Sequence, residues 1–360
     1  MGDRQILLKN WLAAELNSLG MSELFEIVPA SSDASFRRYF RVIPGGGISY
    51  IAMDAPPEHE DCRPFIAIAR AMADTGLYVP RVIRANLEMG FLLLTDLGDR
   101  QYLSELNQDT AHSLYDAAME ALLVLQKSSP PDGLLPVYSR ELLLAEMHLF
   151  IEWFISGELH LEISPTIIAL LENTFQSLAD QALSQPQVWV HRDYHSRNLM
   201  VADGSDSTLP DRGVVINTPG ILDFQDAVLG PVCYDLVSLL RDCYVCWPAE
   251  LTESWVESYF VRLREQGVIP SHTRLAEFRR WFDWMGVQRH LKAIGIFSRL
   301  KLRDGKPDYM PHIPRTFLYI LQVSRSYPEL SLFFRWLEES VLPALISEFG
   351  LADNYYRNSC

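Results

Sequence analysis

The sequence is poor in cysteine and in basic residues, and it has no apolar run long enough to cross a bilayer. It has 31 Lys and Arg against 46 Asp and Glu in 360 residues, a net charge of −15. This balance disfavours a nucleic-acid-binding surface, which needs clustered basic side chains. The first residues also lack the apolar core and cleavage site of a secretory signal. We therefore expect a cytoplasmic protein without nucleic-acid binding or membrane insertion.

The five cysteines are too few and too scattered for a disulfide framework in a chain of this length. Cys243 and Cys246 form a CxxC pair, but no second pair or histidine follows at the spacing of a metal site. We expect both to pack as small apolar residues in a helix that follows Tyr234. This cysteine usage is typical of a reducing cytoplasm.

Two neighbouring stretches carry the strongest chemical signal. VWVHRDYHSRNLMV, at 188–201, places HRD, four further residues and then Asn198 between two apolar runs. In GILDFQDAVLGPVCYDL, at 220–236, a short apolar run ends in Asp223. Each acid thus leaves the end of a buried strand, where a rigid scaffold can hold it. The spacing predicts that Asp193 accepts the proton of an attacking hydroxyl, while Asn198 and Asp223 hold Mg²⁺ against nucleotide phosphates.

HRD-x-x-x-x-N followed by Asp-Phe resembles the catalytic and metal-binding loops of protein kinases. The trailing GPVCYDL, at 230–236, resembles more particularly the aminoglycoside phosphotransferase family, small-molecule kinases built on the protein-kinase fold. Either motif alone could be nothing more than a buried strand followed by an acidic turn. The presence of both motifs, in the order found in kinases, disfavours that explanation. The resemblance implies ATP and Mg²⁺ as cofactors. It also implies a bilobal α+β fold, with a small antiparallel sheet in the first lobe and a larger, mainly helical second lobe.

The apolar patterns fit that division. In residues 1–96 they predict an amino-terminal helix, a helix at 64–75 and five strands, the last four ending near residues 42, 53, 86 and 94. In residues 97–360 they predict helices at 111–126, 140–155, 165–183 and 282–306. The turn-rich segment 202–220 is expected to be a widened hairpin. A chain of this length is long enough for two lobes, each with its own core.

In a kinase-like fold the polar turn at 31–36 would cover the ATP phosphates, although an ordinary hairpin is an equal alternative. The turn is not glycine-rich, so contacts would come from backbone amides and from Ser32 and Ser35, with Arg37 and Arg38 nearby. Kinases carry a phosphate-binding lysine where this chain has Met53, and the helix at 64–75 has no glutamate to pair with it. We therefore predict that an arginine of the Arg37-Arg38 pair replaces that lysine.

The resemblance also implies an adenine-binding hinge at Thr95, Asp96 and Leu97. Farther on, the polar cluster QRHLK at 288–292 interrupts an apolar helical pattern. The ordinary explanation is a solvated helix face, and the functional one is a grip on an acyl-amino or carboxylate group of the acceptor. The candidate acceptor-binding residues are His195, Arg197, Arg289, His290 and Lys292.

The segments DASFRRYFRV, MDAPPE, LLLTDLGD, HRDYHSRNLM and QRHLKAIGIFSRL resemble one subgroup along most of the chain. These are the cell-wall amino-sugar kinases, which phosphorylate N-acetylmuramate and N-acetylglucosamine at the anomeric hydroxyl in peptidoglycan recycling. The resemblance implies the same activity here. Two alternatives stay open: a kinase for an aminoglycoside, a choline-like amine or another sugar, and a nucleotide-binding pseudokinase, which Met53 suggests and the intact HRD-N motif disfavours.

Overall fold

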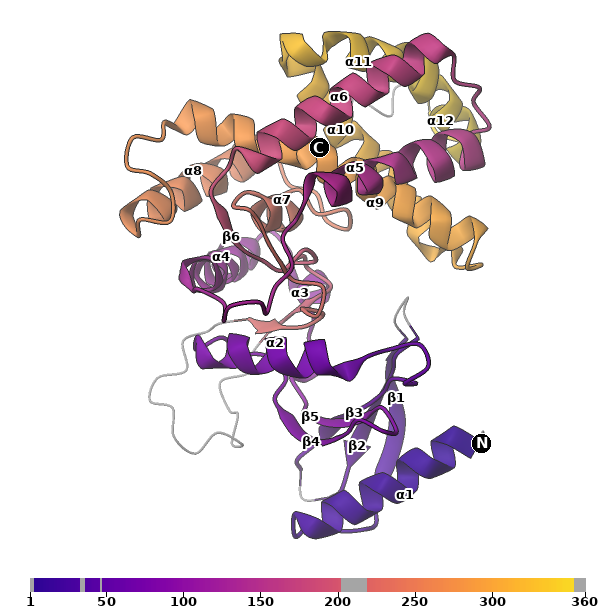
Figure 1. Cartoon of the computed structure of the whole chain (residues 1–360), viewed down its shortest axis with the longest axis vertical. Helices are drawn as coiled ribbons and strands as arrows, with labels where there is room; N and C mark the ends of the chain where they lie inside the picture. Colours follow the sequence, from indigo (N-terminus) through magenta and orange to yellow (C-terminus); the bar gives the residue numbers. More distant parts are fainter. Residues whose placement is uncertain (1–2, 33–35, 46, 202–218, 353–360) are drawn as a thin grey trace.

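The computed structural model of the protein describes residues 3–32, 36–45, 47–201 and 219–352 (Figure 1). The predicted phosphate-loop residue Ser35, the side chain of Ser32 and nearly all of the 202–220 segment lie outside the described residues. In the described part, an antiparallel sheet occupies one end of the molecule and a mainly helical region the other (Figure 1). The predicted α+β arrangement is confirmed.

The sheet has five antiparallel strands in the order β1-β2-β3-β5-β4. Alternate residues of a strand face opposite sides of a sheet. The register of β2 and β3 pairs Phe40 with Ala52, and Tyr39 with Met53, so that these two pairs lie on opposite faces. The strands are β1 (Glu26–Ser32), β2 (Arg38–Ile43), β3 (Tyr50–Asp54), β4 (Val82–Asn86) and β5 (Phe91–Thr95).

Helix α1 (Asp3–Ser18) covers one face of the sheet (Figure 1). Its buried residues Leu8, Leu12 and Leu16 pack with Phe40 and Ala52 in a small core of their own. This core lies on the face of the sheet that points away from the helical region, so side chains on it are turned away from the rest of the protein.

Helix α2 (Cys62–Asp74) covers the other face and lies between the sheet and the helical region (Figure 1). It begins where the Asp61 carboxylate accepts the Arg63 N–H at 2.9 Å, a side-chain N-cap. Phe65 and Ile68 of α2 and Met53 of β3 belong to the large core that continues through the helical region. The apolar cores therefore do not divide at residue 96, and the lobe boundary placed there stays a prediction.

The helical region is built around α9 (Leu275–Leu302), against which α5, α6, α7, α10 and the π-helical η1 pack. At Gly295 a Cβ would lie 2.4 Å from the carbonyl carbon of Leu149, so a side chain there would keep α9 from the α5–η1 junction. The helices are α3 (Tyr102–Glu105), α4 (Ala111–Lys127), α5 (Arg140–Leu149), η1 (Phe150–Glu158), α6 (Pro165–Leu183), α7 (Tyr234–Leu240), α8 (Ala249–Glu265), η2 (Pro307–His312), α10 (Ile313–Ser326), η3 (Pro328–Leu330), α11 (Ser331–Trp336), η4 (Leu337–Val341) and α12 (Leu342–Phe349).

Several predicted boundaries need correction. The helix expected at 140–155 becomes π-helical after Leu149, and the one expected at 282–306 starts earlier, at Leu275. Among the described residues no helix has the length and apolar character needed to cross a membrane.

The prediction that Cys243 and Cys246 lie in the helix after Tyr234 is wrong, because α7 ends at Leu240. The chain turns there, since the buried carboxylate of Asp242 accepts the N–H groups of Tyr244 at 2.9 Å and of Ser196 at 3.0 Å. Cys243 is nevertheless buried in the apolar core, as expected.

Two short antiparallel ladders hold the motif-bearing loops. Strand β6 (Gln187–Val190) pairs with β9 (Val228–Pro231), and β7 (Leu199–Met200) pairs with β8 (Gly220–Ile221). The loop at 191–198 therefore runs from the first ladder to the second, and the loop at 222–227 runs back again. Residues that are distant in sequence meet between the two ladders.

Candidate active site

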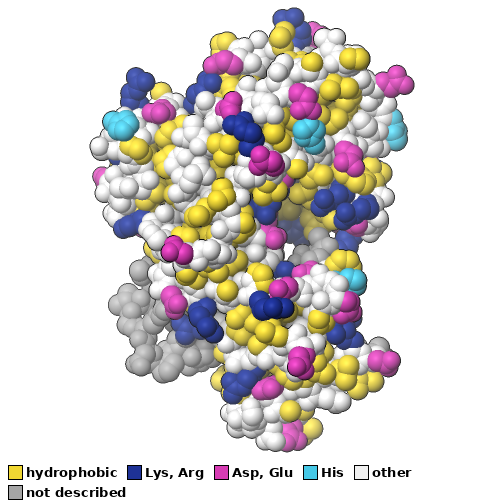
Figure 2. All heavy atoms as spheres, viewed as in Figure 1, with side chains coloured by type: hydrophobic (Ala, Val, Ile, Leu, Met, Phe, Trp, Pro, Cys, Tyr) yellow, Lys and Arg dark blue, Asp and Glu magenta, His cyan; other side chains and the backbone are white. Residues whose placement is uncertain are grey.

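The β7–β8 ladder brings Asn198 and Asp223 together. Leu199 pairs with Ile221, and just outside the ladder the Leu222 N–H donates to the Asn198 carbonyl at 2.9 Å. The side chains also meet, because the Asn198 Nδ2 lies 3.3 Å from Asp223 Oδ2. The two predicted metal-binding residues thus share one site. The surface is hollowed between the sheet and the helical region, with Lys and Arg side chains at the rim (Figure 2).

The orientation of the Asn198 amide fits a magnesium ligand. Its Nδ2 donates to the Asp193 carbonyl at 3.0 Å as well as to Asp223, so its Oδ1 faces the other way. Asp223 has a φ of 62°, a left-handed conformation that is uncommon outside glycine, and its Oδ1 accepts from Gln225 Nε2 at 2.7 Å. An amide oxygen and a carboxylate are oxygen donors of the kind that Mg²⁺ takes from protein, the remainder coming from water and phosphate.

His191 holds the loops in place rather than facing a substrate. Its buried ring donates from Nε2 to the Leu222 carbonyl at 2.9 Å, and its Nδ1 accepts the Asp193 N–H at 3.2 Å. Burial lowers the pKa of His191 to about 4, so the ring is neutral at pH 7 and one nitrogen is free to accept. This ring therefore couples the base-bearing loop to the residue before Asp223.

Asp235, in the first turn of α7, anchors the start of the same loop. Its two carboxylate oxygens accept the N–H groups of His191 at 2.7 Å and Arg192 at 2.9 Å. Burial raises the pKa of Asp235 to about 7, against the opposing effect of these donors. Arg192 has a φ of 78°, and the two backbone N–H hydrogen bonds to Asp235 help to hold the loop in that turn.

Asp193, the predicted base, is partly exposed, so a substrate could reach it. Burial of its carboxyl group would raise the pKa, but the nearby cations Lys292 and Arg192 outweigh this effect and hold it below its usual value. His191 and His195 are neutral at pH 7, because burial lowers the pKa of each. The Asp193 carboxylate is therefore ionised at neutral pH and can accept a proton.

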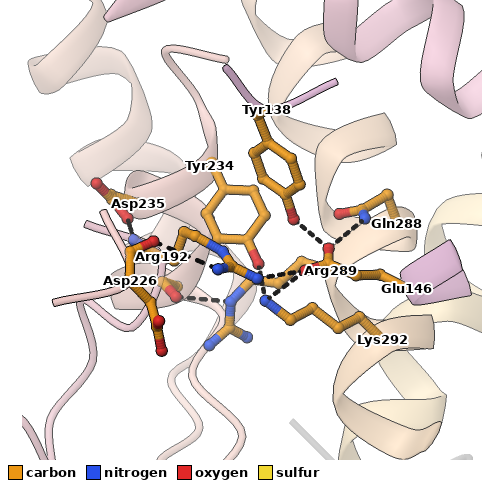
Figure 3. A network of polar contacts seen from close by, with 10 residues as sticks. Tyr138, Glu146, Arg192, Asp226, Tyr234, Asp235, Gln288, Arg289 and Lys292 are labelled. Atoms are coloured by element: carbon orange, nitrogen blue, oxygen red, sulfur yellow. Dashed lines mark hydrogen bonds and ion pairs between the residues drawn. The ribbon is translucent and has the colours of Figure 1, made fainter. Parts of the chain in front are cut away.

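The two cations beside Asp193 are held by one buried carboxylate, Glu146 on α5 (Figure 3). Its Oε1 pairs with Arg192 Nη2 and, at 3.1 Å, with Lys292 Nζ. Its Oε2 accepts from the Tyr138 hydroxyl and from Gln288 Nε2 at 3.2 Å. Burial would raise the pKa of Glu146, but Lys292 and Arg192 lower it, so the group is ionised. We use the name Glu146 network for Glu146 and its four partners, which are Arg192, Lys292, Tyr138 and Gln288.

Sequence reasoning missed the Glu146 network, although a signal was present. Glu146 is a single acid in the apolar helical run LLLAEMHLF, where an acid is costly unless it is paired. Its partners lie on other elements, and Lys292 Nζ also donates to the Tyr234 hydroxyl at 3.0 Å (Figure 3). Only the fold brings these groups together.

The predicted QRHLK cluster is neither a solvated face nor a set of free groups, because its side chains are buried. Arg289 donates from Nε to Ser238 Oγ at 2.6 Å and from Nη1 to Cys243 Sγ at 3.7 Å. His290 donates from Nε2 to the Arg241 carbonyl at 2.9 Å. These partners favour a structural role for Arg289 and His290.

Arg197 is placed differently from that cluster. Its guanidinium carbon lies 4.9 Å from the ring centroid of Tyr244 and 5.3 Å from that of Tyr309. His195 packs edge-on against the same Tyr244 ring, with centroids 5.3 Å apart. Within the described part of the chain no carboxylate lies within ion-pair distance of Arg197. Of the predicted acceptor residues, His195 and Arg197 therefore lie together on the loop that carries Asp193.

Arg37 and Arg38 point to opposite faces of the sheet. Arg38 pairs with Asp54 across β2 and β3, on the α1 face, and the Asp54 carboxylate binds both Arg38 and Arg4 of α1. Arg37 instead reaches Glu60, just before α2, with Nη2 and Oε2 2.9 Å apart. Only Arg37 thus faces the side of the sheet on which the motif loops lie.

Met53 stands where kinases have the phosphate-binding lysine, and it is fully buried in the core that α2 shares with the sheet. Since a charged side chain there would be unpaired in an apolar environment, the lysine has no place in this packing.

At the predicted hinge, the side chains of Thr95 and Asp96 are engaged within the protein, and the Thr95 N–H donates to the Arg81 carbonyl at 3.0 Å. Thr95 Oγ1 accepts the Arg81 N–H at 2.9 Å, and the Asp96 carboxylate binds Arg41 at 2.5 Å and the Ser49 hydroxyl at 2.7 Å. Leu97 packs close to Gly220, where an added Cβ would lie 2.9 Å from Leu97 Cδ1. The side chains of Thr95 and Asp96 are thus occupied in fastening the hinge to the sheet.

Comparisons with known proteins agree with this geometry. A model of the phosphotransferase enzyme family matches residues 26–278. A Pseudomonas putida N-acetylmuramate/N-acetylglucosamine kinase is 46% identical over 327 residues, which are 89% of this chain and 92% of the relative. A Neisseria meningitidis protein of the same name is 42% identical over 342 residues, 94% of this chain and 96% of the relative.

Solved structures show the same fold. The ADP-bound aminoglycoside phosphotransferase APH(2'')-Ib has a TM-score of 0.54 at 13% identity, covering 84% of this chain and 94% of that one. The GDP complex of aminoglycoside 2'-phosphotransferase-IIIa has a TM-score of 0.58 at 14% identity, covering 86% of this chain and 97% of the other. The chain belongs to the phosphotransferase enzyme family, and its fold is protein-kinase-like.

Proposed function

We propose that this protein transfers the γ-phosphoryl group of ATP to the anomeric hydroxyl of N-acetylmuramate and N-acetylglucosamine, and so acts in peptidoglycan recycling in the cytoplasm. The observation that carries the proposal is the 42–46% identity, over most of the chain, with kinases named for these two sugars. The assembly of Asp193, Asn198 and Asp223 in one site supports it, because phosphoryl transfer needs these groups together.

Asp193 is the proposed general base. Its ionised carboxylate would accept the proton of the acceptor hydroxyl as the oxygen attacks the γ-phosphorus. The anomeric hydroxyl is more acidic than a primary alcohol, so a carboxylate base suffices. His191 and Asp235 keep the loop in position, and the Glu146 network keeps two cations beside the base.

Asn198 Oδ1 and the Asp223 carboxylate would hold Mg²⁺, which supplies the charge neutralisation of the β- and γ-phosphates when it is bound. The hydrogen bond from Asn198 to the Asp193 carbonyl, 3.0 Å long, would keep the metal-binding side chain and the base in a constant relative position. This chain therefore contributes mainly orientation, the larger part of what phosphoryl transfer asks of a protein.

Arg37 and Glu60 are the proposed substitute for the missing lysine–glutamate pair. The pair has the same charges, with an arginine just before β2 and an acid just before α2, and Arg37 Nη2 and Glu60 Oε2 are 2.9 Å apart. Arg37 would then reach the α- and β-phosphates. Adenine would meet the backbone of the 95–97 hinge at groups other than the Thr95 N–H, which donates to the Arg81 carbonyl at 3.0 Å. Residues 1–96 would form the nucleotide-binding lobe, and 97–360 the lobe that carries the acceptor site.

The test is incubation with ATP and Mg²⁺ and a panel of acceptors: both amino sugars, an aminoglycoside, choline and glucose. We expect ADP release with the two amino sugars only. Phosphorus NMR of the product should show a sugar 1-phosphate, with loss of the reducing end. A product that still reduces copper and survives mild acid would be a 6-phosphate and would overturn the anomeric assignment. Turnover of another acceptor alone, or of none, would favour one of the two alternative functions.

A further inference from the structure

The surroundings of Arg197 differ from those of three other arginines in the helical region that also lie over aromatic rings. Arg192, Arg241 and Arg280 each pair with a carboxylate, of Glu146, Asp283 and Glu329 respectively. Arg197 is instead partly exposed and lies over the rings of Tyr244 and Tyr309. Because tyrosine is uncharged at neutral pH, this contact orients the guanidinium without cancelling its charge.

The buried carboxylate in the turn after α7 is already engaged by other groups. Asp242 Oδ2 accepts both the N–H and the hydroxyl of Ser196, and its Oδ1 accepts the Tyr244 N–H at 2.9 Å. That carboxylate thus fastens Ser196, the residue before Arg197, to the turn after α7. The guanidinium keeps an uncompensated charge among the described residues, at a fixed place.

That place is on the loop that carries the proposed base. Arg197 lies between Asp193 and Asn198 in a tight loop, in which the His195 N–H donates to the Asp193 carbonyl at 3.0 Å and the Asn198 N–H to the His195 carbonyl at 2.9 Å. Its tyrosines come from the turn after α7 and from η2, both in the helical region. If the phosphates are held from the sheet side, as proposed above, Arg197 lies on the acceptor side of the site.

The aromatic side chains around Arg197 suit a sugar ring. Tyr309 stacks on Phe297 with centroids 5.4 Å apart, and Tyr244 packs against His312 at 4.8 Å. Tyr244, Tyr309 and His312 are partly exposed, so their rings can receive the apolar face of a pyranose. A cation among them offers a paired hydrogen bond to a carboxylate attached to that ring.

We propose that Arg197, held against Tyr244 and Tyr309, binds the lactyl carboxylate of N-acetylmuramate and so sets the preference between the two acceptor sugars. N-acetylglucosamine lacks the lactyl group and has no other carboxylate, so Arg197 makes no charge-assisted contact with it. The inference rests on the proposed function, because it presupposes that both sugars are acceptors.

The test compares the two sugars with Arg197→Gln. Loss of a charge-assisted contact is expected to reduce kcat/KM for N-acetylmuramate by ~10–100-fold, chiefly through KM. For N-acetylglucosamine, kcat/KM should stay within about twofold of wild type. Turnover of that sugar also shows that the variant is folded. Arg197→Lys keeps the charge but not the paired donors, so its kcat/KM for N-acetylmuramate should fall less than that of Arg197→Gln.

A neutral substrate supplies the second arm. The methyl ester of N-acetylmuramate has no lactyl charge, so wild type should turn it over ~10–100-fold less efficiently than the acid, whereas Arg197→Gln should treat the two almost alike. Arg280→Gln is the matched control. Arg280 also stacks on aromatic rings, 4.2 Å from Trp284 and 5.3 Å from Tyr327, but it is paired with Glu329. Substitution of Arg280 should leave kcat/KM unchanged for both sugars.

The outcomes separate the two proposals. If wild type phosphorylates neither sugar, the proposed function itself fails, and this is seen before any variant is made. If wild type uses both sugars and Arg197→Gln lowers both equally, Arg197 acts on the transferred phosphoryl group or on the loop, and the inference is overturned. Unchanged kinetics with both sugars overturn it as well.

Discussion

Replacing Glu146 with leucine tests whether the Glu146 network stabilises the helical region. The side chain of Glu146 is 7% exposed, and those of Arg192 and Lys292 are 17% and 9% exposed. Without the carboxylate, both cations would remain in the interior without a counter-charge. Removing one member of a buried ion pair costs ~3–5 kcal/mol, so we expect Glu146→Leu to lower the free energy of unfolding by that amount.

Urea unfolding followed by tryptophan fluorescence measures this change, through the midpoint and the slope of the transition. The control is Asp180→Ala, which breaks an ion pair with Arg140 whose side chains are 63% and 39% exposed. Exposed pairs contribute ~0–1 kcal/mol, so this control should stay near wild type. Glu146→Gln keeps the shape and the hydrogen bonds to Tyr138 and Gln288 but removes the charge, and it should fall between the two.

A second substitution locates the cause. Combining Glu146→Leu with Lys292→Met removes one of the two unpaired cations, so the double variant should be more stable than the sum of the single effects predicts. If Glu146→Leu unfolds at the same urea concentration as the Asp180→Ala control, the argument is refuted. It is refuted equally if the two substitutions are simply additive, because buried charge would then not be the source of the loss.

The stabilisation by the Glu146 carboxylate should depend on pH in one direction, being lost as the pH falls. The pKa of Glu146 is lowered in the folded protein, so its contribution is present above the unfolded pKa of about 4.3 and is lost as the pH falls through the folded value. The difference in stability between wild type and Glu146→Gln should therefore shrink below about pH 4. A constant difference down to pH 3 would contradict the charge-based explanation.

Four further predictions follow from the site and from the packing. Asp193→Asn should keep ATP binding and slow turnover by ~10²–10⁴, measured by ADP release; near wild-type turnover would remove it as the base. Asp223→Ala should abolish magnesium-dependent activity, and full recovery at raised magnesium would make Asp223 peripheral. Arg37→Ala should raise the KM for ATP far more than that for the sugar, whereas Arg38→Ala should not; unchanged ATP kinetics in both would leave backbone amides as the phosphate clamp. Gly295→Ala should destabilise by ~1–3 kcal/mol, because its Cβ would meet the α5 backbone at 2.4 Å, and an unchanged melting temperature would refute that close packing.

The sequence alone is enough to propose Asp193, Asn198 and Asp223 as the reactive residues, because their spacing is a local property. The apolar runs before Asp193 and Asp223 predict strands, and the strands place each acid at the start of a loop. The sheet and most of the helices follow from local periodicity in the same way. The boundaries are less exact, as at Leu149, where the close contact of Gly295 with the α5–η1 junction accompanies a π-helical turn.

Other features were decided only by the tertiary structure. Glu146 meets Arg192 across 46 residues of sequence and Gln288 across 142, and no local pattern relates positions so far apart. Arg37 and Arg38 are adjacent and chemically alike, yet one faces the motif loops and the other faces α1. Successive side chains of a strand point to opposite faces of the sheet, so the two arginines must differ in direction. Which of the two faces α1 and which faces the motif loops depends on where a distant helix packs. For the same reason the sequence could propose Arg197 as an acceptor residue, but only the fold brings Tyr244 and Tyr309 to it and leaves its charge open to a ligand.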